Sequence, residues 1–382
     1  MPPRILHIIP GLPTGGAERA LLRLTASATP GLFHHVVLSL GHKEEQRGEF
    51  EARGIEVRCL GMRSVFSFPK KLVRFRKTTA ALNASLIHGW MYHGGLAALV
   101  SGSGAPKVLG IRHSLHDISK ETPALRMIIK LLAWQSRRFD VISYNSQASR
   151  LQHEAIGFAA HCGMVLPNGF DTVEFAPDGA ARAKIRQELR LGNNCLVFGH
   201  VARYHPMKNH EGMIRAFSRL SEKMPQAKLL MAGQGVDVQN LALTGLISEL
   251  GLGKNVFLLG ERSDIPDLIN SMDVLVSPSS WGEAFPNVIG EAMACGLPCV
   301  ATDVGDSAPI IGNTGLVCAA GDTPSLFRAI ETIALMGPEK RTMLGEKARQ
   351  RIEEHYSQRQ VTGNWEAIYR SLTLKANKTS HA

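Results

Sequence analysis

Three features are missing from the sequence: paired cysteines, long apolar runs and low-complexity repeats. The six cysteines form no Cys-x-x-Cys pair and no metal-ligand spacing, so we expect reduced, buried thiols and neither a disulfide scaffold nor a zinc site. The uncharged stretch at residues 89–106 is interrupted by a histidine, glycines and serines, and is a poor membrane span. The apolar run at residues 5–9 is too short for a signal peptide, and a proline ends it at once. We therefore expect a cytoplasmic protein that at most lies on a membrane surface.

Negative charge is scarce in the first part of the chain. Residues 1–170 carry 21 Lys and Arg against 10 Asp and Glu, whereas residues 171–382 carry 22 against 23. A positive field of this kind favours an anionic partner such as a lipid headgroup, a phosphate or a nucleic acid, although solubility alone also explains basic surfaces. Basic and apolar residues mix in segments 69–77 and 126–138, which favours an anionic membrane surface over a plain solvated helix face. We expect no nucleic-acid partner, since no recognition motif accompanies the charge.

The pattern of apolar runs predicts two α/β domains. The chain of 382 residues is longer than one hydrophobic core usually serves. Short strand-like runs such as 5–9 and 274–277 alternate with helical patterns throughout, which predicts parallel, doubly wound sheets. Residues 165–178 hold two prolines and an Asn-Gly turn without helical periodicity, and are predicted to be a linker. We expect two Rossmann-like domains, 1–170 and 171–357, that face each other across a cleft, and a disordered tail over 375–382.

The segment 279–298, SSWGEAFPNVIGEAMACGLP, combines a helix start, a helix end and two glutamates. Pro286 suits the first position of a helix, and Gly296 suits the position just past its end. Glu283 then lies in the preceding loop and Glu291 on the second helical turn. The backbone N–H groups of such a helix start bind a diphosphate, a carboxylate on the helix binds a ribose, and one in the loop orients sugar hydroxyls. The alternative is a capped helix that carries exposed glutamates.

Two cations and two glycines follow other predicted strands. Arg203 and Lys208 stand five apart, just past the strand-like run 196–200, where fixed positive charge suits a leaving diphosphate. An ordinary basic surface loop is the alternative. Gly15 and Gly16 join the first strand to the first helix and allow close backbone approach at a helix start, or else form a flexible turn.

Together these motifs resemble the retaining glycosyltransferases of the GT-B fold, family 4 (glycosyltransferase group 1). The resemblance spans nearly the whole chain and is carried by Gly-Gly-Ala-Glu at 15–18, the pair Arg203 and Lys208, and Glu-Ala-Phe-Pro-Asn-Val-Ile-Gly-Glu at 283–291. It implies a nucleotide-sugar donor, most often a UDP sugar, and a C-terminal helix, 358–374, that crosses back to the first domain. The resemblance implies donor contacts for Gly15, Gly16, Arg203, Lys208, Glu261, Ile265, Glu283, Phe285, Asn287, Val288 and Glu291. Among these it places Glu291 on the ribose, Glu283 on sugar hydroxyls, and both cations on the diphosphate.

The first domain is expected to hold the acceptor. His88 and His93 follow one predicted strand, and Arg112 and His113 follow another, where a histidine hydrogen-bonds a hydroxyl or a phosphate. A core or loop position is the alternative for each. The resemblance makes His113 the candidate for the donor sugar, and a catalytic residue beside Arg203, Lys208 and Glu283. Trp90 departs from the family, whose members often carry another histidine there. No Asp-x-Asp pair occurs in a suitable place, so we expect chemistry without a metal or cofactor.

The resulting hypothesis is a hexosyl- or N-acetylhexosaminyltransferase that acts on a lipid-linked or polysaccharide acceptor at the inner face of a membrane. A nucleotide-sugar epimerase is a second enzymatic hypothesis, but the sequence shows no matching pair of a catalytic acid and a catalytic base. The alternative outside the enzymes is a non-catalytic subunit of a glycan-assembly complex. The loss of a residue from the cation or glutamate motif would favour this alternative. The sequence specifies neither the sugar nor the acceptor.

Overall fold

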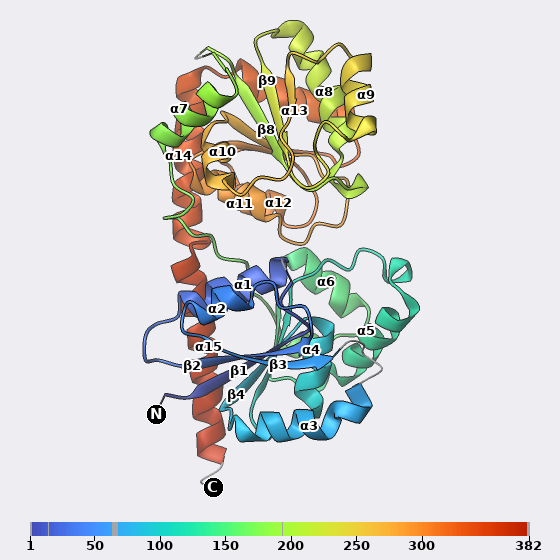
Figure 1. The fold of residues 1–382 in the computed structure, drawn as a ribbon, viewed down its shortest axis with the longest axis vertical. Helices are drawn as coiled ribbons and strands as arrows, with labels where there is room; N and C mark the ends of the chain where they lie inside the picture. Colours follow the sequence, from blue (N-terminus) through green and yellow to red (C-terminus); the bar gives the residue numbers. More distant parts are fainter. Residues whose placement is uncertain (1, 14, 63–67, 193, 380–382) are drawn as a thin grey trace. The chain divides into compact units, whose positions relative to one another are not determined.

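The computed structural model describes residues 2–13, 15–62, 68–192 and 194–379, without the side chains of 68–70 and 377–379. The chain forms two compact units (Figure 1). Unit 1 comprises Met1–Gly169 together with Gln358–Ala382, and unit 2 comprises Phe170–Ser357. The chain thus leaves unit 1 after residue 169 and returns to it for its last helix.

Unit 1 is built on a seven-stranded sheet in which every neighbouring pair is parallel. Its order is β3-β2-β1-β4-β5-β6-β7. The central strands are nearly continuous runs of buried Val, Ile and Leu, as expected for a sheet covered by helices on both faces. The strands are β1 (Arg4–Ile9), β2 (His34–Gly41), β3 (Glu56–Met62), β4 (Leu86–Trp90), β5 (Lys107–Ile111), β6 (Val141–Tyr144) and β7 (Gly163–Val165).

The helices of unit 1 include one from the far end of the sequence. α15 (Gln358–Thr379) packs on α1 and β4, with Trp365 and Tyr369 almost fully buried. The prediction of a disordered tail is wrong for residues 375–379, because the helix continues through them; residues 380–382 lie outside the described chain. The other helices are α1 (Gly16–Ala26), α2 (Arg47–Glu51), α3 (Phe68–Ala81), α4 (Met91–Val100), α5 (Pro123–Gln135) and α6 (Gln147–Ala155).

Unit 2 is a second parallel sheet, with the order β10-β9-β8-β11-β12-β13. Its strands are β8 (Val197–Val201), β9 (Lys228–Ala232), β10 (Val256–Leu258), β11 (Val274–Ser277), β12 (Cys299–Thr302) and β13 (Leu316–Cys318). Its helices are α7 (Gly179–Glu188), α8 (His210–Lys223), α9 (Leu241–Glu249), α10 (Ile265–Asn270), α11 (Asn287–Ala294), α12 (Ser307–Ile311), α13 (Thr323–Leu335) and α14 (Pro338–His355).

Each sheet has one topological switch point. The strand order reverses between β1 and β4 in unit 1, and between β8 and β11 in unit 2. In doubly wound sheets, ligands bind in the crevice outside the carboxyl ends of the strands at such a point. The prediction of two Rossmann-like domains is confirmed, and the two switch points show where to look for a site.

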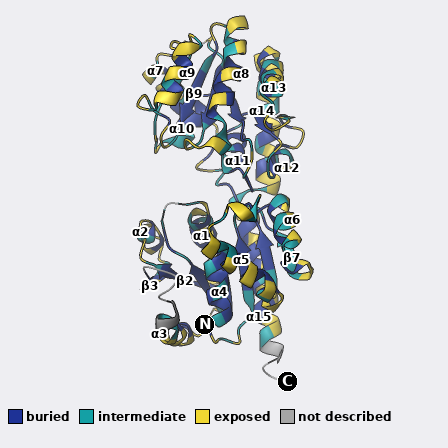
Figure 2. Cartoon of the chain, turned by 90° about the vertical axis from the view of Figure 1, so that its right-hand side faces the viewer, coloured by how far each residue is buried: buried dark blue, intermediate teal, exposed yellow. Residues whose placement is uncertain are grey.

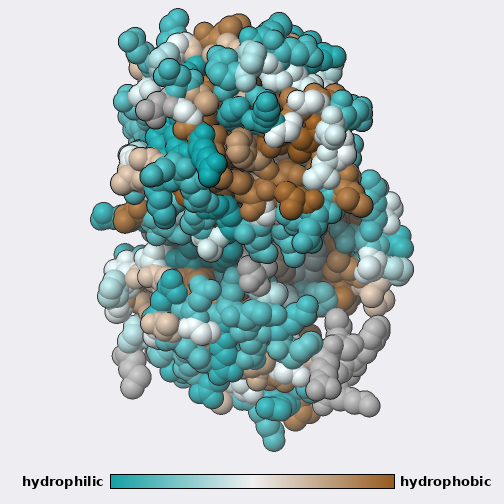
Figure 3. Space-filling model, turned by 45° about the horizontal axis from the view of Figure 1, so that its top comes forward, coloured by the Kyte–Doolittle hydropathy of each residue, from teal (hydrophilic) through white to brown (hydrophobic). Residues whose placement is uncertain are grey.

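Helices shield both sheets from solvent. Figure 2 colours the strands mainly as buried and the outer residues of many helices as exposed. Hydrophilic side chains cover much of the face drawn in Figure 3, as expected for amphipathic helices whose apolar sides pack inward. Within the part of the chain that the structure describes, no helix combines the length and apolar character of a membrane span.

The cysteines are free, as expected, but only Cys295 and Cys299 are buried. The prediction of buried thiols is wrong for the other four, because they lie at partly exposed positions along the edges of the cores. The partly exposed cysteines are Cys59, Cys162, Cys195 and Cys318.

Candidate active site

The loops that follow β8 and β11 are tied together at the switch point of unit 2. The Ser280 backbone N–H donates to the Met207 carbonyl over 2.8 Å. Asn209 adopts a left-handed conformation (φ 54°), accepts the Gly212 N–H at the start of α8, and donates from Nδ2 to the Pro278 carbonyl. A single asparagine thus caps α8 and fastens the loop that carries Lys208 to the end of β11.

Lys208 and Glu283, which the sequence placed in separate motifs, form an ion pair. Lys208 Nζ lies 2.5 Å from Glu283 Oε1, and the two side chains are 20% and 9% exposed. Ser279 Oγ donates to the same Oε1 over 2.7 Å, and Thr302 Oγ1 donates to the Ser279 carbonyl. The carboxylate is therefore held from two sides, which meets the requirement that a buried charge be paired and hydrogen-bonded.

Arg203 is the second predicted cation of this region, and it is not paired. It lies in the loop after β8 with its side chain exposed, and it has no hydrogen bond or ion pair to any residue in the described ranges. Gly233 (φ 146°) lies beside this loop at the end of β9, and a Cβ there would clash with the Ala202 carbonyl. Only glycine permits so close an approach, so the backbone around Arg203 is fixed while its guanidinium remains available.

Two buried histidines that the sequence analysis did not single out lie in the same region. His200, on β8, donates from Nδ1 to the Val276 carbonyl, and His210 donates from Nε2 to the Ala202 carbonyl. Their rings meet edge to face at 4.6 Å. Burial lowers the pKa of His200 well below its usual value and that of His210 to about 4, with the charge of Lys208 adding to both. Both rings are therefore neutral near pH 7, and neither adds a second positive charge beside Lys208.

Helix α11 starts one residue later than predicted. Pro286 is its N-cap, Asn287 its first residue, and Glu291 lies half-buried on its second turn. Gly296 (φ 77°) follows its end, as predicted. The loop–helix arrangement inferred for the glutamates therefore holds.

Phe285 and Val288 differ in burial. The Phe285 ring is buried and stacks on Phe170 at 5.9 Å, and Val288 packs partly against the same core. Their contact with a donor stays a prediction, which for Phe285 falls mainly on its backbone. Glu261 is exposed in the loop after β10, and Ile265 is the first residue of α10.

In unit 1, Gly15 is the N-cap of α1 and Gly16 its first residue. A Cβ at Gly15 would clash with Glu18 Oε2, so the Glu18 side chain lies against the helix start. Burial raises the pKa of Glu18. The predicted anion-binding helix start therefore has a carboxylate of the chain itself beside it.

His113 and His93 flank the switch point of unit 1. His113 follows β5, is 43% exposed, and has its Nε2 3.5 Å from Glu121 Oε1. Its ring stands edge-on to Tyr92 at 6.3 Å. His93, in the first turn of α4, is half-buried, and burial lowers its pKa. Both rings stand at strand ends, as expected.

His88 and Arg112 belong to the interior of unit 1. His88 lies within β4 with no exposed surface, its Nδ1 2.8 Å from the Tyr369 hydroxyl and its ring stacked on Trp90. The prediction that His88 stands at a strand end is wrong, since α15 covers it. The Arg112 guanidinium lies over the rings of Trp90 and Trp365, at 5.6 and 5.4 Å, and donates to the Leu166 carbonyl. Its acceptor role stays a prediction, and burial lowers its pKa to about 10.

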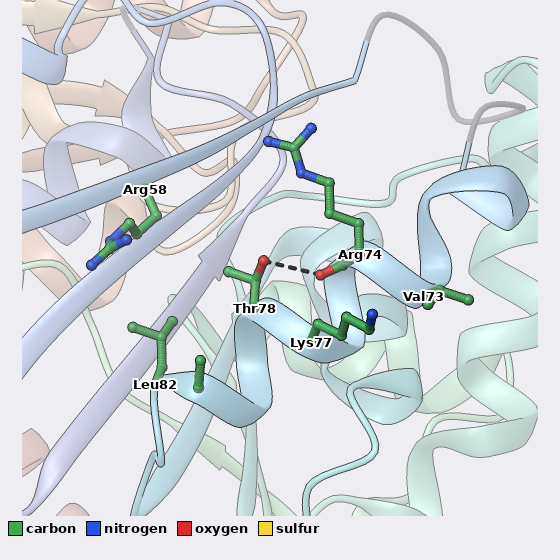
Figure 4. A pocket seen from close by; sticks show the side chains of 7 residues that line it. Arg58, Val73, Arg74, Lys77, Thr78 and Leu82 are labelled. Carbon is green, nitrogen blue, oxygen red and sulfur yellow. Dashed lines mark hydrogen bonds between the residues drawn. The ribbon is translucent and has the colours of Figure 1, made fainter.

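One pocket of unit 1 contains none of the predicted donor or acceptor residues, although part of the basic segment 69–77 lines it. It has a volume of about 700 Å³ and lies between β3 and α3, with Arg58 on the strand and Arg74 and Lys77 on the helix (Figure 4). Val73 at its edge is exposed, whereas Phe75 points into the core. No cluster of three metal-ligating side chains occurs among the described residues.

Comparison with known proteins assigns the family. Residues 14–174 match the model of Glycosyltransferase Family 4, and residues 181–351 match that of Glycosyl transferases group 1. The putative glycosyltransferase EpsF of Bacillus subtilis is 27% identical over 78% of this chain and 79% of its own length. The UDP-Gal:alpha-D-GlcNAc-diphosphoundecaprenol alpha-1,3-galactosyltransferase of Escherichia coli is 32% identical, over 44% of this chain and 43% of its own length.

The fold has solved counterparts. The crystal structure of Anabaena HepE in complex with UDP superposes with a TM-score of 0.83 at 23% identity, over 96% of this chain and all of that one. Sucrose-phosphate synthase of Thermosynechococcus elongatus gives 0.80 at 20% identity, over 98% of this chain and all of that one. With both family models matched and the GT-B architecture present, the chain belongs to the group 1, family 4 glycosyltransferases.

Proposed function

We propose that this protein transfers a sugar from a nucleoside diphosphate, most readily UDP, to the hydroxyl of a lipid-linked or polysaccharide glycan intermediate, with retention at the anomeric carbon. The observation that carries the proposal is the buried Lys208–Glu283 pair at the switch point of unit 2. Such a pair holds a positive and a negative group ready at one place. The cation suits a diphosphate, and the carboxylate suits the hydroxyls of the attached sugar.

Three neighbouring features support a nucleotide-sugar donor. Arg203 adds an unpaired guanidinium in the loop after β8. The first turn of α11 adds backbone N–H groups for the diphosphate, and Glu291 one turn later would bind the ribose. HepE, whose fold this chain shares, has been crystallised with UDP and with UDP-glucose. Unit 2 would therefore be the donor domain, with Glu261 and Ile265 near the base.

In the proposed reaction, the bond between the anomeric carbon and the diphosphate oxygen breaks while the acceptor oxygen bonds to the same face. Negative charge grows on the departing diphosphate, and Arg203 and Lys208 stabilise it there without a metal. The acceptor proton passes to the leaving phosphate oxygen, so no separate base is needed. Glu283, released from Lys208 as that cation turns to the phosphate, orients the sugar hydroxyls, and His113 contacts the sugar from unit 1.

The acceptor assignment rests on relatives and on charge. The Escherichia coli relative acts on a diphosphoundecaprenol-linked sugar, and a relative from Mycolicibacterium smegmatis is a mannosyltransferase that acts on a phosphatidylinositol monomannoside. The excess of basic residues in 1–170 suits a peripheral location at an anionic inner membrane face. We therefore propose a hexosyl- or N-acetylhexosaminyltransferase of glycan assembly in the cytoplasm, with the acceptor held by unit 1.

The test measures donor binding and transfer separately. Wild type should bind UDP and a UDP sugar by calorimetry, and should release UDP when a lipid-diphosphate acceptor is added. Lys208→Ala and Glu291→Ala should lose transfer, while Lys184→Ala, which removes an exposed lysine paired with Asp267, should not. The anomeric configuration of the product, read by NMR, tests retention. Donor binding without transfer to any acceptor would instead favour a non-catalytic subunit, and no binding of UDP, GDP or ADP sugars would contradict the proposal.

A further inference from the structure

Helix α5 carries a row of large apolar side chains on its solvent side. Met127, Leu131 and Trp134 are 65%, 45% and 75% exposed. They follow one another at intervals of four and three residues, so they form one continuous stripe. Elsewhere in the described chain, large exposed apolar residues stand singly on a helix or a strand, or lie in loops. An apolar stripe of this kind marks an interaction surface.

The opposite side of the same helix fixes its position. Ile128, Ile129 and Leu132 are buried against the core of unit 1. The helix starts with Thr122, whose hydroxyl accepts the Leu125 N–H, and with Pro123 at its first position. α5 is therefore apolar on two sides, and its outer stripe cannot be hidden by a rotation of the helix. The outward residues of α5 are coloured as exposed in Figure 2.

Basic side chains flank the stripe on one side. Lys130 is exposed between Met127 and Trp134 on the helical surface, and Arg137 and Arg138 are exposed in the turn that follows. Arg126 lies one turn before Lys130 and is partly exposed. Trp134 itself combines an apolar ring with a polar N–H, the composition of residues found at membrane–water interfaces.

We propose that α5 is the element that docks this protein on an anionic lipid surface, with Trp134, Met127 and Leu131 inserted at the headgroup level and Lys130 and Arg137 on the phosphates. The proposal rests on the membrane-associated acceptor of the proposed function and names the surface involved. Charge complementarity selects the occupant, since an apolar stripe bordered by cations matches acyl chains below anionic headgroups.

The basic helix α3 does not offer the same surface. Among its described large apolar side chains, Phe75 is buried, Leu72 is partly buried, and Val73 is exposed beside Arg74 and Lys77. The described part of α3 therefore supplies charge without an insertable stripe. Vesicle binding should depend on α5 for its apolar part.

The tryptophans make the docking directly observable. Trp90 and Trp365 are buried and Trp281 is 37% exposed, so of the four in the chain Trp134 faces solvent most openly. Vesicles of equimolar phosphatidylglycerol and phosphatidylethanolamine should shift the emission of the full-length protein to the blue. Brominated lipid should quench it. In Trp134→Phe the vesicles should still bind the protein, and the shift and the quenching should be lost.

Flotation with the same vesicles measures how strongly each side chain contributes to membrane binding. Trp134→Ser and Leu131→Ser should each weaken partitioning by about tenfold, because an apolar side chain no longer enters the interface. Lys130→Glu should weaken binding to these vesicles at low salt, and phosphatidylcholine vesicles should bind the wild type poorly. Leu241→Ser removes an equally apolar side chain that is 84% exposed in unit 2, and should have no effect.

Several outcomes would overturn the proposal. The proposal is wrong if the wild type fails to float with anionic vesicles, or if the stripe variants float as well as the wild type. Quenching that persists in Trp134→Phe would place another segment in the lipid. A concentration-dependent dimer that dissociates in Trp134→Ser would assign the stripe to a second copy of the chain. The stripe variants should keep wild-type affinity for UDP in detergent solution, so a failure of docking is distinguishable from a failure of the proposed function.

Discussion

The ammonium of Lys208 lies 2.5 Å from the carboxylate of Glu283, although 75 residues separate them in the sequence. The contact joins the loop after β8 to the loop after β11. Each partner keeps the other neutralised in a largely buried place. In the proposed reaction, a donor would replace this contact with two others, one from its diphosphate to the lysine and one from its sugar hydroxyls to the carboxylate.

The first prediction separates the charge of this pair from its packing. Lys208→Met should lower kcat by about 100-fold or more, since one fixed cation at a developing charge is lost. It also leaves Glu283 buried without its partner, and should destabilise unit 2 by about 3 kcal/mol. The double variant Lys208→Met/Glu283→Gln should recover most of the stability and none of the activity. Recovery of activity in the double variant would show that the pair is structural only.

The second prediction concerns Asn209, which holds the Lys208 loop. Asn209→Ala loses the cap of α8 and introduces a residue that adopts positive φ less readily than asparagine, and should lower stability by about 1–2 kcal/mol. Asn209→Gly tolerates that backbone and should recover part of the stability. Both variants lose the hydrogen bond to the Pro278 carbonyl, so both should raise the KM for the donor. A normal KM in the glycine variant would contradict the positioning role.

The third prediction is a loss of stability in acid. Burial lowers the pKa of His35 to about 4, as it does for His153, whose Nε2 contacts the Tyr92 hydroxyl. Because the folded-state pKa lies below the unfolded value, the unfolded chain binds more protons between about pH 4 and 6.5. Stability is complete above that range and falls as pH decreases through it, by about 2 kcal/mol for each histidine at pH 5.

Urea unfolding at pH 7 and pH 5 measures this effect. The difference between the two free energies of unfolding should shrink in His153→Gln, which has no proton to gain. An unchanged difference in that variant would show that His153 does not take up a proton on unfolding.

The fourth prediction concerns a glycine in α11. A Cβ at Gly290 would meet the Phe170 ring, which itself stacks on Phe285. Gly290→Ala should therefore destabilise unit 2 by about 1–3 kcal/mol, although alanine favours helices. Gly245→Ala in α9, where a Cβ meets nothing, should stabilise by about 0.5–1 kcal/mol. Thermal unfolding of the two variants compares them, and a shift of the same sign in both would contradict the packing argument.

Sequence patterns predicted most of the fold because buried parallel strands are continuous apolar runs. The strand 274–277 occurs where it was expected. The strands β7 and β13 were missed, since each has only three residues and none of these is fully buried.

The motifs of the site could be predicted from the sequence, but the contacts and the burial of their residues could not. Glu283 and Lys208 stood out by residue type at the ends of strands, yet nothing in the sequence told that they touch. His88 and Phe285 looked similar to His113 and Glu283 in position, and their burial depends on α15 and on Phe170, which are distant in sequence. The stripe on α5 was hidden for the same reason: an apolar residue in a helix gives no sign of which side faces solvent.

The place of α15 also bears on how the protein is made. A ribosome releases residues 1–169 long before residues 358–379, which supply Trp365 and Tyr369 to the same core. Until then the nascent first unit has no cover for His88 and Trp90, whereas unit 2 emerges as one uninterrupted segment. We expect unit 2 to complete its folding first, although it is second in the chain, and the N-terminal unit to close only after α15 has been synthesised.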